Sequence, residues 1–223
     1  MQLHLLCNAG FLLKAEEASL LVDAPNRTHP PFYTLPSQVW QEILDRRPPY
    51  DHVCGLWFSH NHPDHCDLDK ARDYLTKWPD AFCFVPEEKH IRGKGKAGPF
   101  EIEYQRVNHA PIPMAPPHVV TWIKAGEKSV YFPSDAELNC EVHRNFLKNR
   151  KADVAIWNSM YLSKEDTRQL MTETAGRNFI CHMPQQRPDE GGLWRKLEKN
   201  LERFGEELQN VTIVDHYPFK IEI

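Results

Sequence analysis

The sequence has no long hydrophobic run. Nowhere in its 223 residues does a stretch approach the roughly 18 consecutive apolar residues of a membrane-spanning helix. The segment from Met1 to Leu6 also lacks the basic region and the uninterrupted apolar core of a secretion signal. From these two absences we expect a cytoplasmic protein that does not bind membranes.

Neither sign of charge is in large excess, and no two cysteines form a C-x-x-C pair. With 27 Lys and Arg residues against 31 Asp and Glu residues, the formal net charge is −4, so nothing indicates a nucleic-acid groove. We expect a small-molecule substrate and no nucleic acid as partner, and the oligomeric state is left open. The 6 cysteines lie mostly in apolar, strand-like runs, which predicts reduced and mostly buried thiols.

Strand-like and helix-like patterns together predict an α/β fold. The length fits one domain over residues 1–223. Strand-like runs occur at residues 2–6, 10–14, 18–23, 53–58, 81–85, 100–107, 119–125, 128–133, 152–157, 177–181, 210–215 and 218–223. Helical patterns fit residues 37–46, 67–77, 137–149, 164–174 and 190–207. We expect mixed sheets covered by helices, because each sheet must bury an apolar face.

What the sequence does contain is a dense group of metal-ligand residues. His60, His62, Asp64 and His65 spell His-x-His-x-Asp-His directly after the apolar run at residues 53–58. Imidazole and carboxylate side chains suit Zn, Fe or Mn ions. A solvated, histidine-rich turn is the alternative, but four potential ligands in one short loop favour a metal site.

The local geometry of this motif allows two adjacent metal positions. His60 and His62 lie two residues apart and can point the same way in an extended chain. Asp67 is a candidate N-cap for the next helix, which places Asp64 and His65 in the turn between strand and helix. These two side chains can therefore face a second position beside the first.

The motif and four further residues resemble the metallo-β-lactamase-fold superfamily of metal-dependent hydrolases over nearly the whole chain. The family's His-x-His-x-Asp-His motif is matched in full at residues 60–65. The family also has an Asp ending an early strand, a His before a β-hairpin, an Asp ending the second hairpin strand, and a last His at a strand end. These elements resemble Asp23, His109, Asp135 and His182, in that order.

The resemblance implies a four-layer αββα sandwich of two mixed β-sheets flanked by helices, with two divalent metal ions. It implies that one ion is held by His60, His62 and His109. The other ion would be held by Asp64, His65 and His182, and Asp135 would bridge the two ions. Asp23 would orient a ligand imidazole. Asp135 lies in Pro-Ser-Asp-Ala, where the family more often shows Gly-Asp-Thr, so the local geometry of the bridge is left open.

Some residues near these ligands have a second interpretation. His118 lies in the same loop region as His109, and either could be the ligand. His109 is preferred because it directly follows a strand-like run, whereas His118 begins the next one. Cys66 and Cys181 adjoin expected ligands, but the neighbouring imidazoles explain the pattern better, so both thiols are expected to be packing residues.

Hydrolysis is the expected reaction of such a site. Two divalent ions lower the pKa of a bridging water toward neutrality and so supply a hydroxide nucleophile. The candidate catalytic carboxylates are Asp64, Asp135 and Asp23. The sequence does not distinguish Zn, Mn and Fe, because all three accept these ligands.

Substrate choice must come from the loops. Arg27 could grip a phosphate or a carboxylate, and Asn26, His118 and His216 are further candidates for substrate binding. Resemblance to small family members favours a phosphodiester or cyclic phosphate, with a lactone or carboxylic ester as the alternative. A non-catalytic metal-binding scaffold or sensor would be favoured if Tyr217 or His118 plugged the metal face. An oxidoreductase would need a flavin or persulfide partner that the sequence does not show.

Overall fold

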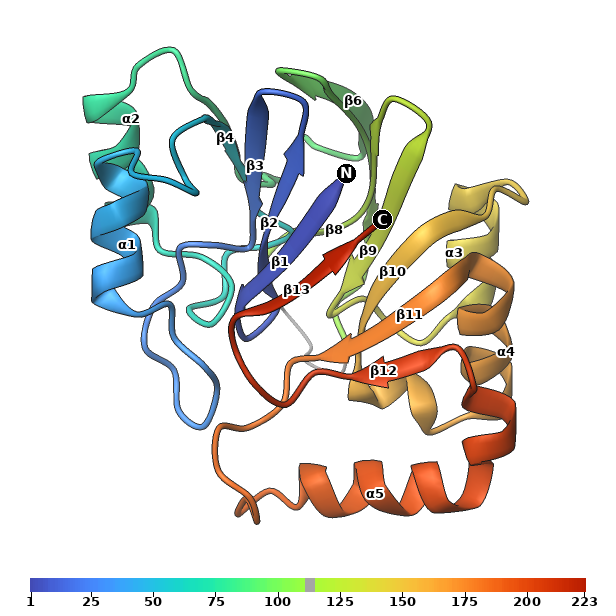
Figure 1. The fold of residues 1–223 in the computed structure, drawn as a ribbon. Coiled ribbons are helices and arrows are strands. Elements are labelled where there is room, and N and C mark those ends of the chain that lie inside the picture. Colours follow the sequence, from blue (N-terminus) through green and yellow to red (C-terminus); the bar gives the residue numbers. More distant parts are fainter. Residues whose placement is uncertain (111–114) are drawn as a thin grey trace.

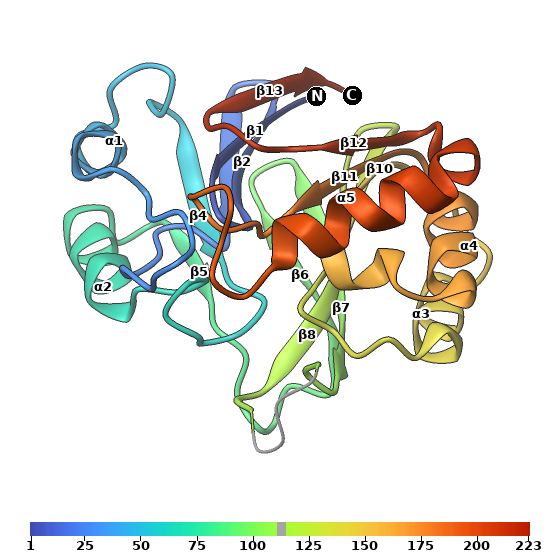
Figure 2. The same ribbon diagram turned by 90° about the horizontal axis from the view of Figure 1, so that it is seen from below.

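Two β-sheets pack face to face, and helices cover both outer faces (Figures 1 and 2). The structure is a computed structural model that describes residues 1–110 and 115–223. Both sheets contain parallel as well as antiparallel strand pairs. The predicted α/β architecture of two mixed sheets flanked by helices is confirmed. Residues 111–114 of the expected proline-rich loop lie outside the described residues.

The six-stranded sheet has the order β13-β1-β2-β3-β4-β5. Its strands are Phe219–Glu222 (β13), Gln2–Cys7 (β1), Gly10–Ala15 (β2), Ala18–Val22 (β3), Val53–Trp57 (β4) and Phe82–Phe84 (β5). β3, β4 and β5 run parallel, and the other neighbours are antiparallel. The loops that follow β3 and β4 therefore leave the sheet at the same edge.

The seven-stranded sheet has the order β12-β11-β10-β9-β8-β7-β6. Its strands are Val211–Ile213 (β12), Ala175–Cys181 (β11), Ala152–Asn158 (β10), Lys128–Ser134 (β9), His118–Ala125 (β8), Phe100–Val107 (β7) and Arg92–Ala97 (β6). The four strands β9 to β12 run parallel, whereas β6 to β9 form an antiparallel meander. The carboxyl ends of β9, β10 and β11 thus share one edge.

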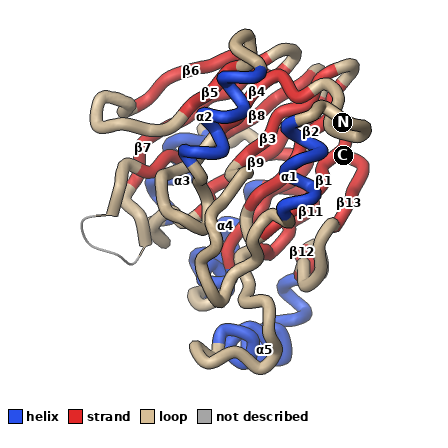
Figure 3. Tube along the Cα trace, turned by 90° about the vertical axis from the view of Figure 1, so that its left-hand side faces the viewer, coloured by secondary structure: helices blue, strands red, loops and turns tan. Residues whose placement is uncertain are grey.

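Helices α1 (Ser37–Leu44) and α2 (Leu68–Lys77) lie over the six-stranded sheet, as Figure 3 shows in blue over red. Helices α3 (Cys140–Leu147) and α4 (Glu165–Thr174) lie on the outer side of the seven-stranded sheet. Helix α5 (Leu193–Phe204) runs across one end of the molecule, and 3₁₀ turns occupy Ser159–Leu162 and Gly205–Leu208. Asp67 caps α2 as predicted, since its carboxylate accepts hydrogen bonds from the backbone N–H groups of Asp69 and Lys70.

Three apolar clusters hold these layers together. The cluster between the sheets takes buried side chains from both, and Phe11 and Phe132 meet edge to face across it at 5.1 Å. A second cluster packs α3, α4 and α5 on the seven-stranded sheet, and a third packs α1 and α2 on the six-stranded sheet. With apolar side chains on both faces, strands such as β3 and β10 are nearly continuous hydrophobic runs.

The strand β6 was not predicted from the sequence. Its residues, Arg-Gly-Lys-Gly-Lys-Ala, combine charge and glycine, which are depleted in strands. The strand is tolerated because it lies at the edge of the sheet, where exposed charged side chains also discourage pairing with other chains. Gly93 is required there, because a Cβ atom would lie 2.6 Å from the hydroxyl oxygen of Tyr104.

The expected helix at 190–207 is shorter in the structure. It begins only at Leu193, because the Asp189 carboxylate accepts hydrogen bonds from the backbone N–H groups of Leu193 and Trp194 and so fixes the start. Helix α3 is also shorter than expected and is capped by the Asn139 side chain.

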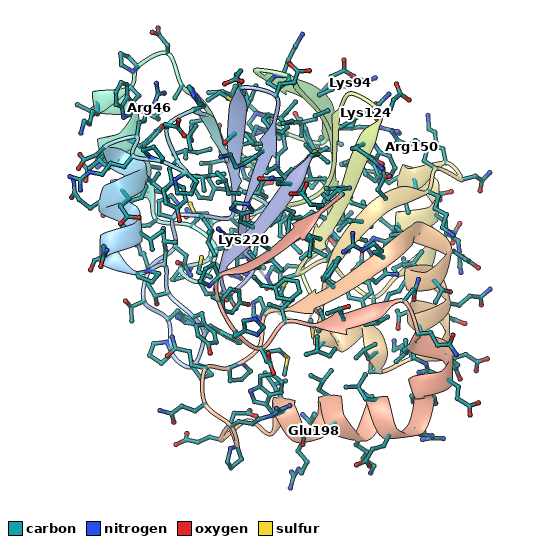
Figure 4. All side chains as sticks on the ribbon, in the orientation of Figure 1. Arg46, Lys94, Lys124, Arg150, Glu198 and Lys220 are labelled. Atoms are coloured by element: carbon teal, nitrogen blue, oxygen red, sulfur yellow. The ribbon has the colours of Figure 1, made fainter. Side chains whose placement is uncertain are left out.

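No helix among the described residues is long and apolar enough to cross a membrane. The labelled side chains of Lys94 and Lys124 project from the end of the molecule opposite α5, whereas Glu198 projects outward from α5 itself (Figure 4).

A buried histidine on α3 predicts a pH-dependent stability. His143 donates from Nε2 to the backbone carbonyl of Glu137, so Nδ1 accepts the hydrogen bond of the Tyr131 hydroxyl at 2.6 Å. Burial lowers the pKa of His143 to about 4. The unfolded chain, with a histidine pKa of about 6.5, therefore binds this proton more tightly than the folded protein. Below pH 6.5 this group should lower the free energy of unfolding, by about 3 kcal/mol in total near pH 4.

Urea denaturation at pH 7 and pH 4.5 measures this effect. We expect wild type to lose about 2 kcal/mol more than His143→Gln between these two pH values. His52→Gln, which changes an exposed histidine, is the control and should behave like wild type. Equal losses in wild type and His143→Gln would contradict the prediction, whatever the stability of the variant at pH 7.

Candidate metal centre

Strand ends from both sheets bring the predicted metal-ligand residues together. Asp23 follows β3 and His60 comes shortly after β4 in one sheet, while Asp135 follows β9 and His182 follows β11 in the other. The chain turns sharply at three of these places, because Asp23, Ser134 and His182 have positive φ angles of 46°, 51° and 62°. Such backbone is uncommon for residues other than glycine and is concentrated at functional sites.

The first donor group consists of three imidazoles. His60 Nε2 lies 3.0 Å from His62 Nδ1 and 3.3 Å from His109 Nε2. These are the three residues that the family resemblance assigned to one ion, and their ligand atoms lie within 4.8 Å of one another. The geometry thus favours His109 over His118 in this group.

The second donor group consists of two carboxylates and two imidazoles: Asp64, His65, Asp135 and His182. His182 Nε2 lies 3.1 Å from both Asp64 Oδ2 and His65 Nε2, and 3.3 Å from Asp135 Oδ2. His65 Nε2 lies 3.2 Å from Asp135 Oδ2 and 3.5 Å from Asp64 Oδ2. The four ligand atoms, one from each of these side chains, all lie within 4.8 Å of one another.

Both groups fit a divalent cation. A tetrahedral zinc ion with ligands at 2.0–2.1 Å places neighbouring ligand atoms about 3.3 Å apart, which is close to the separations in both groups. Asp135 Oδ2 also lies 3.6 Å from His109 Nε2, so the same oxygen borders both groups. The two donor groups therefore lie side by side, with Asp135 between them.

The surroundings of the first group favour neutral imidazoles. Burial lowers the pKa of His60 well below its usual value, and the neighbouring His65 and His118 lower it further. Burial also lowers the pKa of His62 and of His109. A neutral imidazole has a free lone pair, which is the form that binds a metal.

The second group carries negative charge that needs a cation. Burial works against ionisation of Asp64 and Asp135, yet His182 and His65 hold the pKa of both carboxyls well below its usual range. The same carboxylates overcome burial to raise the pKa of His65 well above its usual value and that of His182 to about 9. Without a metal ion, two protons on imidazoles must balance the carboxylates, so a divalent cation is a natural replacement.

Asp23 has the position expected of a residue that orients a ligand. Its carboxylate is fully buried and accepts a hydrogen bond of 2.8 Å from His65 Nδ1, which leaves His65 Nε2 for the second donor group. The backbone N–H and the hydroxyl of Ser59 also donate to it, each at 2.6 Å. Asp23 thus orients His65 and also fixes Ser59, the residue that precedes His60.

Three supporting residues were not found from the sequence. Ser59 Oγ lies 2.9 Å from His60 Nδ1, and because its own proton is donated to Asp23, it can accept a hydrogen bond from the Nδ1–H of His60 and leave His60 Nε2 free. Asn158 Nδ2 donates to Asp135 Oδ1, and Asn8 Nδ2 donates to Asp64 Oδ2. Their strand-end positions were a weak signal, because serine and asparagine are common in any turn.

His118 is buried beneath the donor groups. Its Nε2 accepts a hydrogen bond of 3.2 Å from the backbone N–H of Asp135, and its ring lies 4.9 Å from that of His60. His118 therefore does not make the expected substrate contact, because its side chain is buried and lies outside the described lining of the cavity over the donor groups. His118 positions the backbone of Asp135.

The other expected substrate contacts also lie elsewhere. Asn26 is buried and binds the backbone of its own loop at Tyr33 and Leu35, and its Nδ2 also donates to the backbone carbonyl of Asp64 at 3.1 Å. Arg27 points to acidic side chains around the start of α2, with its nitrogens 3.6 Å from Asp67 and 3.5 Å from Asp69. His216 is exposed and pairs with the adjacent Asp215. Asn26 thus supports the backbone of Asp64, whereas Arg27 and His216 are paired with acidic side chains.

An open cavity of about 390 Å³ lies over the donor groups. Part of its lining is formed by the candidate ligands His62, Asp64, His109, Asp135 and His182. The rest of the lining is largely apolar and consists of His29, Phe32, Pro63, Ala110, Asn158, Ser159, Met160 and Leu193. Neither arginine nor lysine occurs in this lining, as far as the described residues go. The cavity therefore gives access to the donor atoms but offers a bound group no arginine or lysine side chain among the described residues.

The cysteines are packing residues at this site. All six are free, and Cys66 and Cys181 are both about 1% exposed. Burial raises the pKa of both thiols, which disfavours the thiolate that binds metals.

Comparison with solved structures identifies the fold. No family model matches the sequence, and no curated protein matches it. The metallo-β-lactamase fold protein YhfI from Bacillus subtilis superposes with a TM-score of 0.64 at 15% identity, over 99% of this chain and 98% of that one. An isothiocyanate hydrolase from Delia radicum gut bacteria gives 0.64 at 14% identity, over 100% and 99%. A possible metal-dependent hydrolase from Veillonella parvula gives 0.65 at 15% identity, over 100% and 99%. The chain therefore has the metallo-β-lactamase fold, as its motifs indicated.

Proposed function

We propose that this chain, as one domain over residues 1–223, is a metal-dependent hydrolase that binds two divalent ions of Zn, Mn or Fe. The observation that carries the proposal is the pair of adjacent donor groups on the floor of an open cavity. A site that only stored metal would need no such access. Neither Tyr217 nor His118, the residues that could have plugged the metal face, belongs to the described cavity lining.

The side chains have separate tasks in the proposed reaction. Divalent ions in the two donor groups would lower the pKa of a water molecule and polarise the bond under attack. Asp64 and Asp135 line the cavity, so their carboxylates can orient that water. Asp23 does not reach the cavity and acts by orienting His65. His29 lines the cavity outside both donor groups and is placed to protonate a leaving group.

We propose an uncharged carboxylic ester or lactone as the substrate class. An apolar wall and the lack of arginine and lysine in the described lining favour an uncharged group next to the metals. Arg27, the residue expected to grip a phosphate, is paired with Asp67 and Asp69 instead. A small phosphodiester or cyclic phosphate is the second candidate, because adjacent donor groups that share Asp135 suit two-metal cleavage of phosphate esters.

Elemental analysis of the purified protein after reconstitution with Zn, Mn or Fe tests the metal centre. We expect about two ions per chain, one for each donor group. A measured content of one ion per chain would argue against a bridging role for Asp135. No ion with any of the three metals would refute the proposed function.

A substrate panel then separates the candidate classes. We expect the reconstituted protein to hydrolyse 4-nitrophenyl butanoate or a γ-lactone faster than bis(4-nitrophenyl) phosphate. Phenyl isothiocyanate belongs in the panel because one structure of similar fold is an isothiocyanate hydrolase. Preference for the phosphodiester would reverse the order of the two candidates, and the chelated protein is the control.

A further inference from the structure

Two loops from opposite sheets meet at the rim of the metal cavity. The loop between β3 and α1 and the loop between β11 and α5 form a backbone bridge between Phe32 and Pro184. Gln185 strengthens it, because its backbone N–H donates to the carbonyl of Pro31 at 2.8 Å and its Nε2 donates to the carbonyl of Phe32 at 2.9 Å. The position of Phe32 is therefore set by contacts between the two sheets.

The Phe32 ring lies directly against a metal-ligand residue. Its centroid is 4.4 Å from that of His182, with the rings at 64°. The loop is also fixed just after Phe32, because the Asn26 side chain binds the backbone carbonyl of Tyr33 at 2.9 Å and the backbone N–H of Leu35 at 2.8 Å. The backbone that carries Phe32 is therefore held in place, and its side chain forms a wall of the cavity.

This wall separates two hollows. Phe32 and Leu193 line the 390 Å³ cavity over the donor groups and also a second hollow of about 640 Å³. Apart from these two residues, the second hollow is lined by the two rim loops alone: Thr28, Pro30, Pro31, Thr34, Gln185, Gln186, Pro188, Asp189, Glu190 and Gly191. A chain that extended from the metal cavity past Phe32 would enter it.

We propose that Phe32 is the specificity-determining residue that limits the length of the acyl group, and that the second hollow is a subsite which longer acyl chains reach only when the ring is removed. The proposal rests on the proposed function in one respect, namely that the substrate is an ester or lactone. A short acyl group would lie against Phe32, Met160 and Leu193 within the metal cavity. A longer chain would collide with the Phe32 ring, whose bridged backbone cannot move aside easily.

The first test compares 4-nitrophenyl butanoate with 4-nitrophenyl octanoate. The ratio of kcat/KM for octanoate to that for butanoate should rise about tenfold in Phe32→Ala, with a smaller rise in Phe32→Leu. Tyr33→Ala is the matched control, because Tyr33 is the adjacent aromatic residue but packs on Tyr217 and lies outside both described linings. The control should keep the wild-type ratio. An unchanged ratio in both Phe32 variants would overturn the proposal.

A binding measurement separates this proposal from the proposed function. Butanoate and octanoate, the acid products, are titrated by calorimetry into the metal-loaded wild type and Phe32→Leu, the milder replacement. Tighter octanoate binding in the variant, without hydrolysis of any ester, would support the role of Phe32 and refute the esterase function. Hydrolysis of butanoate with no change in chain-length preference would refute the role of Phe32 alone. If the protein neither hydrolyses an ester nor binds either acid, both the esterase function and the role of Phe32 are refuted.

Discussion

Replacement of Asp135 by alanine is expected to remove at least one bound ion per chain and to lower kcat about a hundredfold or more. Asp135 Oδ2 lies between 3.2 and 3.6 Å from the Nε2 atoms of His65, His182 and His109, and so borders both donor groups. Loss of a group that merely supports a ligand typically costs 10- to 100-fold in metal affinity or activity, so loss of a shared ligand should cost at least as much.

Elemental analysis and steady-state kinetics on the same preparation measure this effect. Asp215→Ala is the control, because Asp215 is half exposed and pairs with His216 at the surface. The control should keep both ions and the wild-type kcat. Full metal content in Asp135→Ala, with circular dichroism like that of wild type, would show that this carboxylate is not a ligand.

Replacement of Asp23 by alanine is expected to lower both stability and metal affinity. Three buried donors lose the Asp23 carboxylate as their acceptor. These are His65 Nδ1, the hydroxyl of Ser59 and the backbone N–H of Ser59. A buried donor without its partner costs about 1–3 kcal/mol, so the free energy of unfolding should fall by about 3 kcal/mol or more. Metal affinity should fall about 10- to 100-fold, because His65 would no longer be held in one orientation.

Urea denaturation of the metal-free protein and competition with a chromogenic chelator measure the two effects separately. Ser59→Ala should give a smaller loss of stability, because the Asp23 carboxylate keeps its bonds to His65 and to the backbone of residue 59. Asp73→Ala on the exposed face of α2 should change the free energy of unfolding by less than about 0.5 kcal/mol. Wild-type metal affinity in Asp23→Ala would show that Asp23 does not orient a ligand.

The sequence predicted the fold well because its signals are local. The apolar runs before Asp23, His60 and His182 are strands that lie between two layers, and continuous burial makes such strands easy to recognise. Strand β6 escaped recognition because an exposed edge strand needs no apolar run. The end of a helix can also be set by one side chain, as Asp189 does for α5.

Long-range contacts decided what the site can bind. Arg27 has the chemistry to bind a phosphate, but its loop places it beside Asp67 and Asp69. Phe32 had no signal in the sequence, because its place against His182 depends on a bridge to Pro184, more than a hundred residues later in the chain. An apolar wall of the cavity thus comes from segments that meet only in the folded molecule.

By itself, the sequence determined the kinds of metal-ligand residues and the order in which they occur. Four of them lie within six positions, so their chemistry is a property of one loop, and the others come at or shortly after the ends of strand-like runs. The tertiary structure decided that two donor groups form, that Asp135 borders both, and that Phe32 walls the cavity. The physical reason is that residues in different sheets have no fixed distance until the apolar layers pack, and only that packing sets separations of about 3 Å between ligand atoms.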